Sequence, residues 1–214
     1  PSAQILDRKW VDRHDCDAAD VNLDGRMDFY CSMGAEKGTG AKTNELWLQD
    51  ADGVFSQAAG HGADNTYGRS RHPVFFDLNH DGLPDLYDTV YDELRDDGQP
   101  NINRVYVNQG GGRFSEVTTR ATGRNGFQCG AKGDVNGDGW DDLVVCKAHF
   151  VGHLYVNNRR SDFDDLAEGR FGAEWVDAKL ADVTGDGRDD LLLITAGDVF
   201  QVWPNTGSMP FFTA

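Results

Sequence analysis

The chain has 214 residues, with 20 basic and 36 acidic side chains that give a formal net charge of −16 at pH 7. Such an acidic chain is expected to bind neither nucleic acid nor an anionic membrane. No run of about 18 apolar residues occurs, so no membrane-spanning helix is expected. The 26 glycines and the scarcity of long helical patterns favour an all-β, turn-rich protein with a sizeable core.

The first segment, residues 1–13, contains Ile5, Leu6 and Trp10 and precedes the first repeat. We expect it to be either a strand that pairs with the last repeat or a linker from a longer chain. Because Pro1 is not an initiator Met and no signal peptide is present, we expect a processed or trimmed product.

Four copies of one nine-residue segment follow, and they begin at Asp20, Asp77, Asp134 and Asp182. Each copy has an oxygen-bearing side chain at positions 1, 3, 5 and 9 and Gly at position 6. Ca²⁺ prefers about six to eight hard oxygen ligands, and alternate residues of a tight loop can turn side chains and a carbonyl inward. Gly at position 6 permits a sharp turn at which a Cβ would be strained. The repeats therefore predict up to four Ca²⁺ sites, each with the carbonyl of position 7 as a further ligand.

The predicted ligands follow directly from this template. The first site is expected to use Asp20, Asn22, Asp24, Arg26 and Asp28. The second is expected to use Asp77, Asn79, Asp81, Leu83 and Asp85. The third is expected to use Asp134, Asn136, Asp138, Trp140 and Asp142. The fourth is expected to use Asp182, Thr184, Asp186, Arg188 and Asp190. Four bound Ca²⁺ would add eight positive charges and bring the net charge from −16 to −8.

An EF-hand shares the first half of this template but requires Glu at position 12 and flanking helices. Position 12 holds Cys31, Asp88, Val145 and Leu193. Short apolar runs rich in strand-forming residues follow position 9, so each loop is expected to lead into a strand. One such loop alone could be only an Asx-rich surface turn, but four copies at near-regular spacing favour cation binding.

The first residues of the four loops are 57, 57 and 48 residues apart, a period typical of propeller blades. Each unit continues with an aromatic residue between apolar neighbours, namely Trp47, Tyr106, Tyr155 and Trp203. An amide follows two residues later, at Gln49, Asn108, Asn157 and Asn205, and then a turn and a Phe. The pattern predicts a single all-β domain, a β-propeller of four four-stranded blades at 14–60, 71–122, 127–172 and 175–214. The four aromatic residues are expected in the core between blades.

The four cysteines have informative positions. Cys16 and Cys31 lie at −4 and +11 from the first Asp of loop one, and Cys129 and Cys146 lie at −5 and +12 from that of loop three. Facing residues of an antiparallel hairpin have a constant index sum, and both offset pairs sum to +7. This favours two disulfides within blades, Cys16–Cys31 and Cys129–Cys146, and an oxidising compartment. Four buried free thiols are the alternative.

Insertions at 32–45 and 89–103 lengthen blades one and two on the face opposite the loops. They predict a binding surface, because loops commonly carry function, or they are neutral insertions. Two basic pairs, Arg13-His14 and Arg71-His72, are expected at the mouth of the central channel on that face. There they would bind the carboxylate or sulfate of an acidic ligand, or a His would act as a base. The alternative is that they pair with neighbouring acids.

Trp140 lies at the tip of the third loop. A residue whose carbonyl faces a metal is not expected to be a pure core residue. Trp140 is therefore expected either to pack on the adjacent blade or to offer a stacking face for a sugar ring.

The Asp-x-Asn-x-Asp-Gly-x-x-Asp-Leu loops, with the later Leu-Tyr-Val-Asn and Gly-x-Phe segments, resemble the FG-GAP and VCBS repeats of integrin-α-like propellers. The resemblance extends from about Asp15 onward and implies Ca²⁺ between the first two strands of each blade, held by the ligands named above. Thr184 departs from the pattern and is a weaker ligand than Asn, so site four is expected to be the loosest. Propellers of this family usually have about seven blades. This chain is therefore expected to be a small ring, part of a larger propeller, or one of several copies that complete a ring.

Such repeats occur in adhesion receptors, lectins, polysaccharide lyases and phospholipases, so the resemblance does not define an activity. The chain has no Gly-x-Ser-x-Gly, His-Glu-x-x-His or glycosylation sequon. The first hypothesis is a secreted, calcium-stabilised binding module for a glycan or an extracellular protein, lectin-like or adhesive. The second is a polysaccharide lyase or hydrolase, or the propeller fragment of a larger extracellular enzyme, with His14 or His72 and Arg13 or Arg71 at a uronate.

Overall fold

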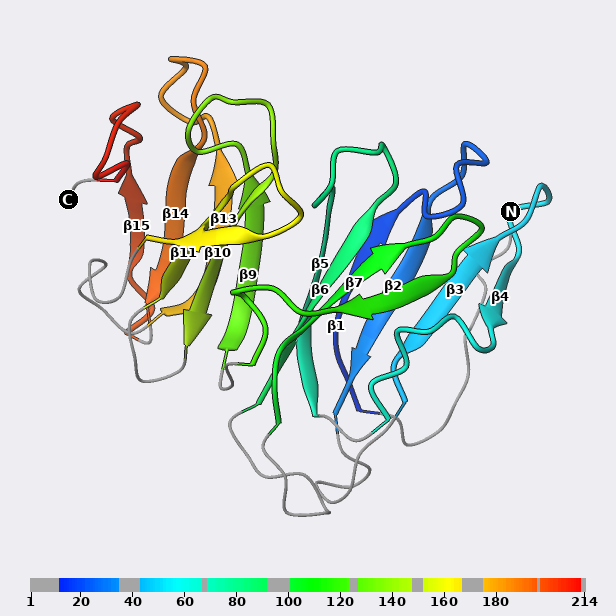
Figure 1. Ribbon diagram of the computed structural model, residues 1–214. Helices are drawn as coiled ribbons and strands as arrows, with labels where there is room; N and C mark the ends of the chain where they lie inside the picture. Colours follow the sequence, from blue (N-terminus) through cyan, green and yellow to red (C-terminus); the bar gives the residue numbers. More distant parts are fainter. Residues whose placement is uncertain are drawn as a thin grey trace.

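The computed structural model describes residues 12–34, 43–66, 69–91, 101–123, 127–147, 152–166, 175–195 and 197–212. All regular elements in these ranges are β-strands, and they form four antiparallel sheets, one for each repeat (Figure 1). These ranges contain no helix with the length and apolarity of a membrane span. The predicted N-terminal strand or linker falls mostly on residues outside these ranges, as do the central parts of the two insertions.

Three of the four sheets have four strands each, arranged in chain order. Blade one consists of β1 (Arg13–Ala19), β2 (Asp28–Met33), β3 (Glu45–Gln49) and β4 (Phe55–Ala58). Blade two consists of β5 (Ser70–Phe76), β6 (Asp85–Val90), β7 (Arg104–Asn108) and β8 (Phe114–Val117). Blade three consists of β9 (Phe127–Gly133), β10 (Asp142–Lys147), β11 (His153–Asn157) and β12 (Phe163–Asp165).

Blade four differs from the expected four strands, because its sheet contains three. They are β13 (Trp175–Ala181), β14 (Asp190–Thr195) and β15 (Phe200–Trp203). Where the fourth strand was expected, the structure has an isolated bridge between Asn205 and Phe212. The segment between them includes Gly207 and Pro210, and a proline has no N–H to donate to a ladder. One bridge therefore takes the place of a strand.

The first two strands of every blade pair in the same register, and the acidic loop joins them. The last residue of the first strand faces the ninth loop residue in each blade, as in Ala19 opposite Asp28 and Gly133 opposite Asp142. Asp85 and Asp190 have the corresponding pairings in the other two blades. Each first strand also has a register shift near its beginning, which the sequence did not reveal. The loops thus lie between strands one and two, as predicted.

This register brings the predicted cysteine pairs opposite each other. The disulfides Cys16–Cys31 and Cys129–Cys146 are both present, with Cα–Cα distances of 4.1 and 5.1 Å. Each links the first and second strands of its blade. The prediction of two intrablade disulfides is therefore confirmed.

The core consists of three apolar layers, each between neighbouring blades. Tyr30 and Leu46 of blade one pack with Phe75, Leu86 and Tyr106 of blade two. The two other layers join blades two and three and blades three and four in the same manner. Tyr106 and Tyr155 are fully buried between blades, as expected, and Trp203 packs against its layer while half-buried. Trp47 is also only half-buried, because it lies on the face of blade one that no earlier blade covers.

The first strands of the blades line the centre of the molecule. β1 packs against β5, β5 against β9, and β9 against β13. Blades one and four are the two ends of this series and lie on opposite sides of Figure 1. Side chains from all four of these strands face a shared central cavity.

One carboxylate, Asp88, is fully buried between blades one and two. Its oxygens accept hydrogen bonds from the hydroxyls of Ser32 and Ser70 at 2.7 and 2.6 Å. They also accept bonds from the side-chain amides of Asn44 and Asn65 at 2.9 and 3.0 Å. Burial raises the pKa of Asp88, although these four donors act in the opposite direction. The network therefore joins blades one and two through buried hydrogen bonds to a single carboxylate.

We expect the variant Asp88→Ala to lower the free energy of unfolding by about 3 kcal/mol or more, because four buried donors lose their acceptor. Chemical denaturation followed by tryptophan fluorescence measures this loss. The control is Asp52→Ala, in an exposed turn, which should change stability by no more than about 0.5 kcal/mol. Equal stabilities for both variants would show that the network contributes nothing.

The disulfides give a second expectation for stability. Cys16–Cys31 and Cys129–Cys146 close loops of 15 and 17 residues, for which the chain-entropy model gives about 3 kcal/mol each. Removal of one disulfide by a double Cys→Ala substitution should lower the unfolding free energy by about that amount. Reducing agent should destabilise the native chain by more than the loss of one disulfide, because both disulfides are then broken. It should leave the stability of a variant without cysteines unchanged. An unfolding midpoint insensitive to both treatments would contradict this.

Candidate cation loops and central cavity

The four acidic loops share one hydrogen-bonding pattern. In each, the carboxylate at position 1 accepts the backbone N–H groups of positions 5 and 6, at N–O distances of 2.7–3.2 Å. The carboxylate at position 5 accepts the N–H of position 7 at 2.8–3.0 Å. In loops one to three, the side-chain oxygen of the Asn at position 3 also accepts the N–H of position 5, which is thus shared with the carboxylate of position 1. Oxygens from positions 1 and 3 are thereby brought close together.

The backbone of the loops explains the glycine at position 6. Gly25, Gly82, Gly139 and Gly187 have φ angles of +82 to +84°, a region that a side chain makes unfavourable. Position 4 is left-handed as well, and here two loops have residues with a Cβ, Leu23 at +56° and His80 at +59°. The sequence analysis missed this second left-handed position, because only loops three and four have glycine there, at Gly137 and Gly185.

The carboxylate at position 9 is completely buried in all four blades. One oxygen accepts the N–H of loop position 2, and the other accepts the N–H of the amide residue at the end of the third strand, as in Asp142 with Val135 and Asn157 at 3.0 and 2.8 Å. The other blades repeat both bonds. Burial raises the pKa of Asp85 to about 6 and that of Asp142 to about 7. Position 9 thus joins the loop to the sheet.

The amide residues that follow the third strands connect one blade to the one before it. The side-chain N–H of Asn108 donates to the Val21 carbonyl at 2.9 Å. Asn157 and Asn205 donate in the same way to the position-2 carbonyls of loops two and three, each at 2.9 Å. The sequence showed these amides at a constant position but not their role. We call this bond the amide latch.

The loops offer the donor set of a hard cation. Carboxylates at positions 1 and 5, an amide oxygen at position 3 and a further carboxylate at position 9 are the oxygen ligands that Ca²⁺ prefers. Position 9 retains acceptor capacity, because a carboxylate has about four lone-pair sites and these carboxylates accept two backbone N–H groups each, or three in the case of Asp190. Among the described residues, no group of three or more His, Cys, Asp or Glu side chains is arranged to hold a metal ion. The residues fit Ca²⁺ in kind, and the ion would supply charge that offsets carboxylate repulsion.

Arginines contact the position-5 carboxylate in three loops. Arg26 pairs with Asp24 in loop one, and Arg188 pairs with Asp186 in loop four. Both residues stand at position 7, where only their carbonyls were predicted to matter. In loop three the guanidinium of Arg159 is 2.8 Å from Asp138, and it comes from the turn after β11. In loop two, the side-chain amide of Asn79 donates to Oδ2 of Asp81 at 2.9 Å.

Loop four differs from the others at position 3, as the sequence suggested. The backbone N–H of Thr184 donates to Asp190 at 3.0 Å, and Asp182 accepts a third N–H, from Gly185, at 2.6 Å. An Asn at this position accepts the N–H of position 5 in the other loops. Loop four thus differs from the other loops in the backbone bonds around position 3, and the weaker fourth site stays a prediction.

Trp140 contacts the neighbouring blade. Its indole stacks on the His80 ring of loop two, with a centroid distance of 4.8 Å and an interplanar angle of 26°. The backbone N–H of Asp77 also donates to Asp141 at 2.9 Å, so loops two and three are joined twice. Of the two roles expected for Trp140, packing on the adjacent blade describes its position.

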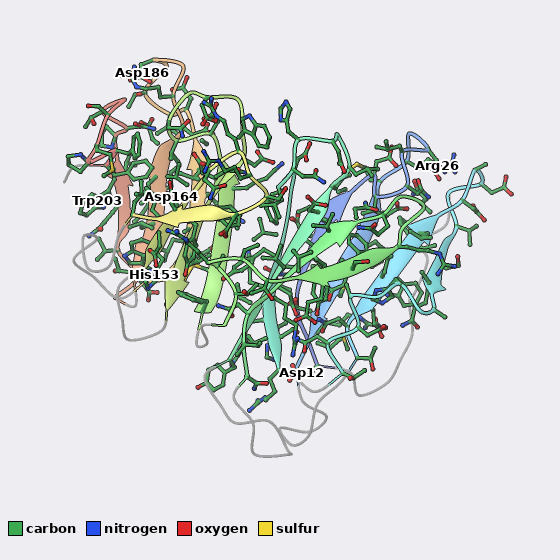
Figure 2. The ribbon with its side chains drawn as sticks, in the orientation of Figure 1. Asp12, Arg26, His153, Asp164, Asp186 and Trp203 are labelled. Atoms are coloured by element: carbon green, nitrogen blue, oxygen red, sulfur yellow. A yellow bond between two sulfur atoms is a disulfide. The ribbon has the colours of Figure 1, made fainter. Side chains whose placement is uncertain are left out.

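The loops lie at one end of the blades. Figure 2 shows Arg26 and Asp186 at the upper end of the molecule and Asp12 at the lower end, next to the start of β1. The central cavity extends between the first strands and has two neighbouring parts with volumes of about 500 and 440 Å³, which share Asp15, His72 and Lys179 as lining residues. The smaller, more polar part is lined by His14, Asp15, Arg71, His72, Cys129, Val176, Asp177 and Lys179.

Both predicted histidines lie in this polar part and are paired with acids. His72 pairs with Asp15 through Nδ1. His14 contacts Asp12 through Nε2 at 3.0 Å. Burial and the nearby Arg71 lower the pKa of His14 despite this contact. Burial acts to raise the pKa of Asp15. The hydrogen bond and the charge of His72 act in the opposite direction, and the net result is that the pKa of Asp15 is lowered.

The predicted arginines have different surroundings. Arg13 pairs with Glu45, at 2.9 Å from Nε and 2.8 Å from a terminal nitrogen, and does not line the cavity. The guanidinium of Arg71 lies over the Tyr91 ring at 4.5 Å and does line the cavity. Of the two basic pairs, the second thus contributes both members to the cavity and the first contributes only His14.

The structure adds cavity residues that the sequence analysis did not select. Lys179 of β13 lines both parts of the cavity, and its ammonium is close enough to Asp15 to lower the pKa of that carboxyl. Lys132 of β9 lines the larger part and is 3.0 Å from Asp141. Alignment of the four first strands would have shown that both lysines stand on cavity-lining strands. It could not show that they face Asp15 or His72 of other blades.

Four sheets around a central cavity, each with an acidic loop between its first two strands, define a repeat β-propeller. A family model described as an FG-GAP-like repeat matches residues 20–87 and 134–193, which together cover more than half of the chain. The chain therefore belongs to the FG-GAP-like repeat family. No curated protein matches the chain.

Proposed function

We propose that the chain is an extracellular propeller module whose four acidic loops bind Ca²⁺ and whose central cavity binds an acidic glycan. The observation that carries the first part is the common arrangement of the four loops, with three carboxylates each and the same backbone bonds. Such a set of carboxylates repels itself unless a cation or another positive group lies among them. Two disulfides and the family membership support an extracellular location.

The charges of the cavity support the ligand class. Arg71, His72, Lys132 and Lys179 line the cavity, together with the carboxylates of Asp15, Asp17, Asp77 and Asp177. Lys179 is exposed, and the described residues provide it with no ion pair within hydrogen-bonding distance. A uronate carboxylate or a sulfate group would pair with Arg71 or Lys179, and Arg is well suited to bind either. A glycan with repeated acidic groups could thus enter a cavity of this size.

A second candidate is a polysaccharide lyase, because His72 forms a His–Asp pair with Asp15 and stands next to Arg71 and Lys179. A paired histidine can act as a general base, and the two cations could neutralise the uronate group. Absorbance of an unsaturated product during incubation with a uronate polymer would support this candidate. Binding without such a product supports the binding module.

Calcium binding is tested by thermal unfolding with Ca²⁺ and with EGTA. A ligand at about 100 times its Kd stabilises the native state by about 2.7 kcal/mol per site, which corresponds to a Tm change of about 5–10 °C for a chain of this size. We expect Asp81→Asn to lose about this much of the calcium-dependent stabilisation. In EGTA the same variant should be as stable as the native chain or more stable, because one repelling charge is gone.

Asp52→Asn is the matched control, since it removes one exposed carboxylate outside the loops. Its response to Ca²⁺ should equal that of the native chain. A Tm that is the same in Ca²⁺ and EGTA would reject calcium binding. Equal responses from Asp81→Asn and the native chain would reject the second loop as a site.

Glycan binding is tested by titration of polygalacturonate into the calcium-loaded chain. We expect Lys179→Gln to weaken binding about tenfold, because a cavity cation that contacts a carboxylate contributes about 1.4 kcal/mol. Arg120→Gln removes the same charge from an exposed position on blade two and should leave the affinity unchanged. Equal loss in both variants would indicate a nonspecific charge effect, and no binding by the native chain would reject this ligand class.

A further inference from the structure

The fourth blade has an apolar face that is exposed in the single chain. Val183, Ile194, Phe200 and Val202 are 51, 39, 59 and 42% exposed, and Leu192 is half-buried beside them. Ile194 faces Phe200 and Leu192 faces Val202 across β14 and β15, so these four side chains share one side of the sheet. We call this set of five residues the blade-four face. It lies opposite the side that packs against blade three.

The equivalent positions of the other blades are fully buried. Val183 corresponds to Val21, Leu78 and Val135, which are 0, 0 and 1% exposed. Val202 corresponds to Leu46, Val105 and Leu154, which are 0, 0 and 3% exposed. In blades one to three, the following blade covers these residues. The blade-four face is thus half of an interblade interface.

The other half is also present on the chain, on blade one. Phe29 stacks on Trp47 and contacts Phe55 at a tilted angle, on the side of blade one that faces away from blade two, and all three are half-buried. We call this set the blade-one face. The equivalents of Trp47 and Phe55 in blades two and three are Tyr106, Tyr155, Phe114 and Phe163, which are all buried.

The internal interfaces show how the two faces would meet. Leu46 shares a core layer with Tyr106, Val105 shares one with Tyr155, and Trp203 packs against the layer that contains Leu154. By the same repeat, Val202 would face Trp47. Gln49 occupies the place of the latch amide on blade one, and the Val183 carbonyl occupies the place of its acceptor.

We propose that the blade-four face of one copy packs on the blade-one face of a second copy, and reciprocally. Two copies would then form one ring of eight blades with two equivalent seams. Copies joined through unlike faces form a closed ring only when repeated rotation from one copy to the next leads back to the first copy. A two-fold axis satisfies this condition, uses each face once and leaves no apolar face uncovered. This proposal does not depend on the ligand of the cavity.

Light scattering during size-exclusion chromatography tests the proposal with the complete chain in physiological salt and Ca²⁺. We expect a mass twice the 23.6 kDa of one chain. Val202→Asp should convert it to a single chain, because both seams would bury an unpaired charge. Since Val202 is exposed in the single chain, the variant should remain folded, and its far-ultraviolet circular dichroism checks this.

Val54→Asp is the matched control, because Val54 is 44% exposed, close to the 42% of Val202. Its equivalent in blade two, Arg113, stays exposed although blade one covers that side, so position 54 lies outside the seam. The control should remain a dimer. A native chain of single mass at all concentrations, or a dimeric Val202→Asp variant, would overturn the proposal.

Mixing two variants tests whether unlike faces meet. Val202→Asp damages only the blade-four face, and Trp47→Asp damages only the blade-one face. Each variant alone should be a single chain, whereas an equal mixture retains one undamaged seam and should recover a heterodimer. A mixture that stays monomeric while both variants keep native circular dichroism would exclude the head-to-tail arrangement.

Discussion

The buried carboxylate at the ninth loop position is the interaction on which the rest of the structure depends. Each of these four aspartates accepts a backbone N–H from the beginning of the loop and one from the residue at or just after the end of the third strand, and Asp190 accepts a third, from Thr184. Burial of a carboxylate is unfavourable unless its oxygens are hydrogen-bonded, so the loop and the strand must take positions that satisfy both oxygens. The same residue begins the second strand. One side chain therefore determines the relative positions of three parts of each blade.

This constraint also explains why the blades stack regularly. The residue whose N–H bonds the ninth-position carboxylate is, in blades two to four, the asparagine of the amide latch. Its side chain then reaches the preceding loop at the same distance of 2.9 Å each time. Because the backbone of this asparagine is held within its own blade, its side chain contacts the neighbouring blade at a constant place. The hydrogen bonds within each blade thus determine where the blade contacts the preceding one.

The sequence predicted the features that depend on local spacing. The loop template, the strand after it, the common register and both disulfides all follow from residues close together in the chain. The left-handed position 4 was missed, because glycine indicates it in only two of the four loops, at Gly137 and Gly185. The missing fourth strand of blade four was missed as well, although Pro210 and Gly207 indicated weak pairing.

Features that depend on the arrangement of blades could not be predicted. Lys179 and Asp15 are far apart in sequence and come near each other only because β13 and β1 line one cavity. Trp47 has the same position in its repeat as Tyr106, yet it is less buried, because burial depends on whether a preceding blade is present. The position of Arg13 on Glu45 likewise results from the pairing of strands.

The distribution of charge connects the loops with the cavity. The carboxylates of the loops lie at one end of the blades, while several of the cations line the cavity. An acidic ligand would contact cavity cations such as Lys179 and would be repelled by the net negative charge of the molecule. Four bound Ca²⁺ would halve the net charge of −16 and so weaken this repulsion, which acts over about 8–10 Å in physiological salt. Cation binding and ligand binding would then favour each other.

Direct counting of bound calcium tests the proposal that each of the four acidic loops is a cation site. Equilibrium dialysis of the chelator-treated chain against Ca²⁺, followed by elemental analysis, gives the number of ions per chain. We expect four, with three bound more tightly than the last, which corresponds to the loop with Thr184. A chain that retains no calcium above the level of the dialysis buffer would contradict the account.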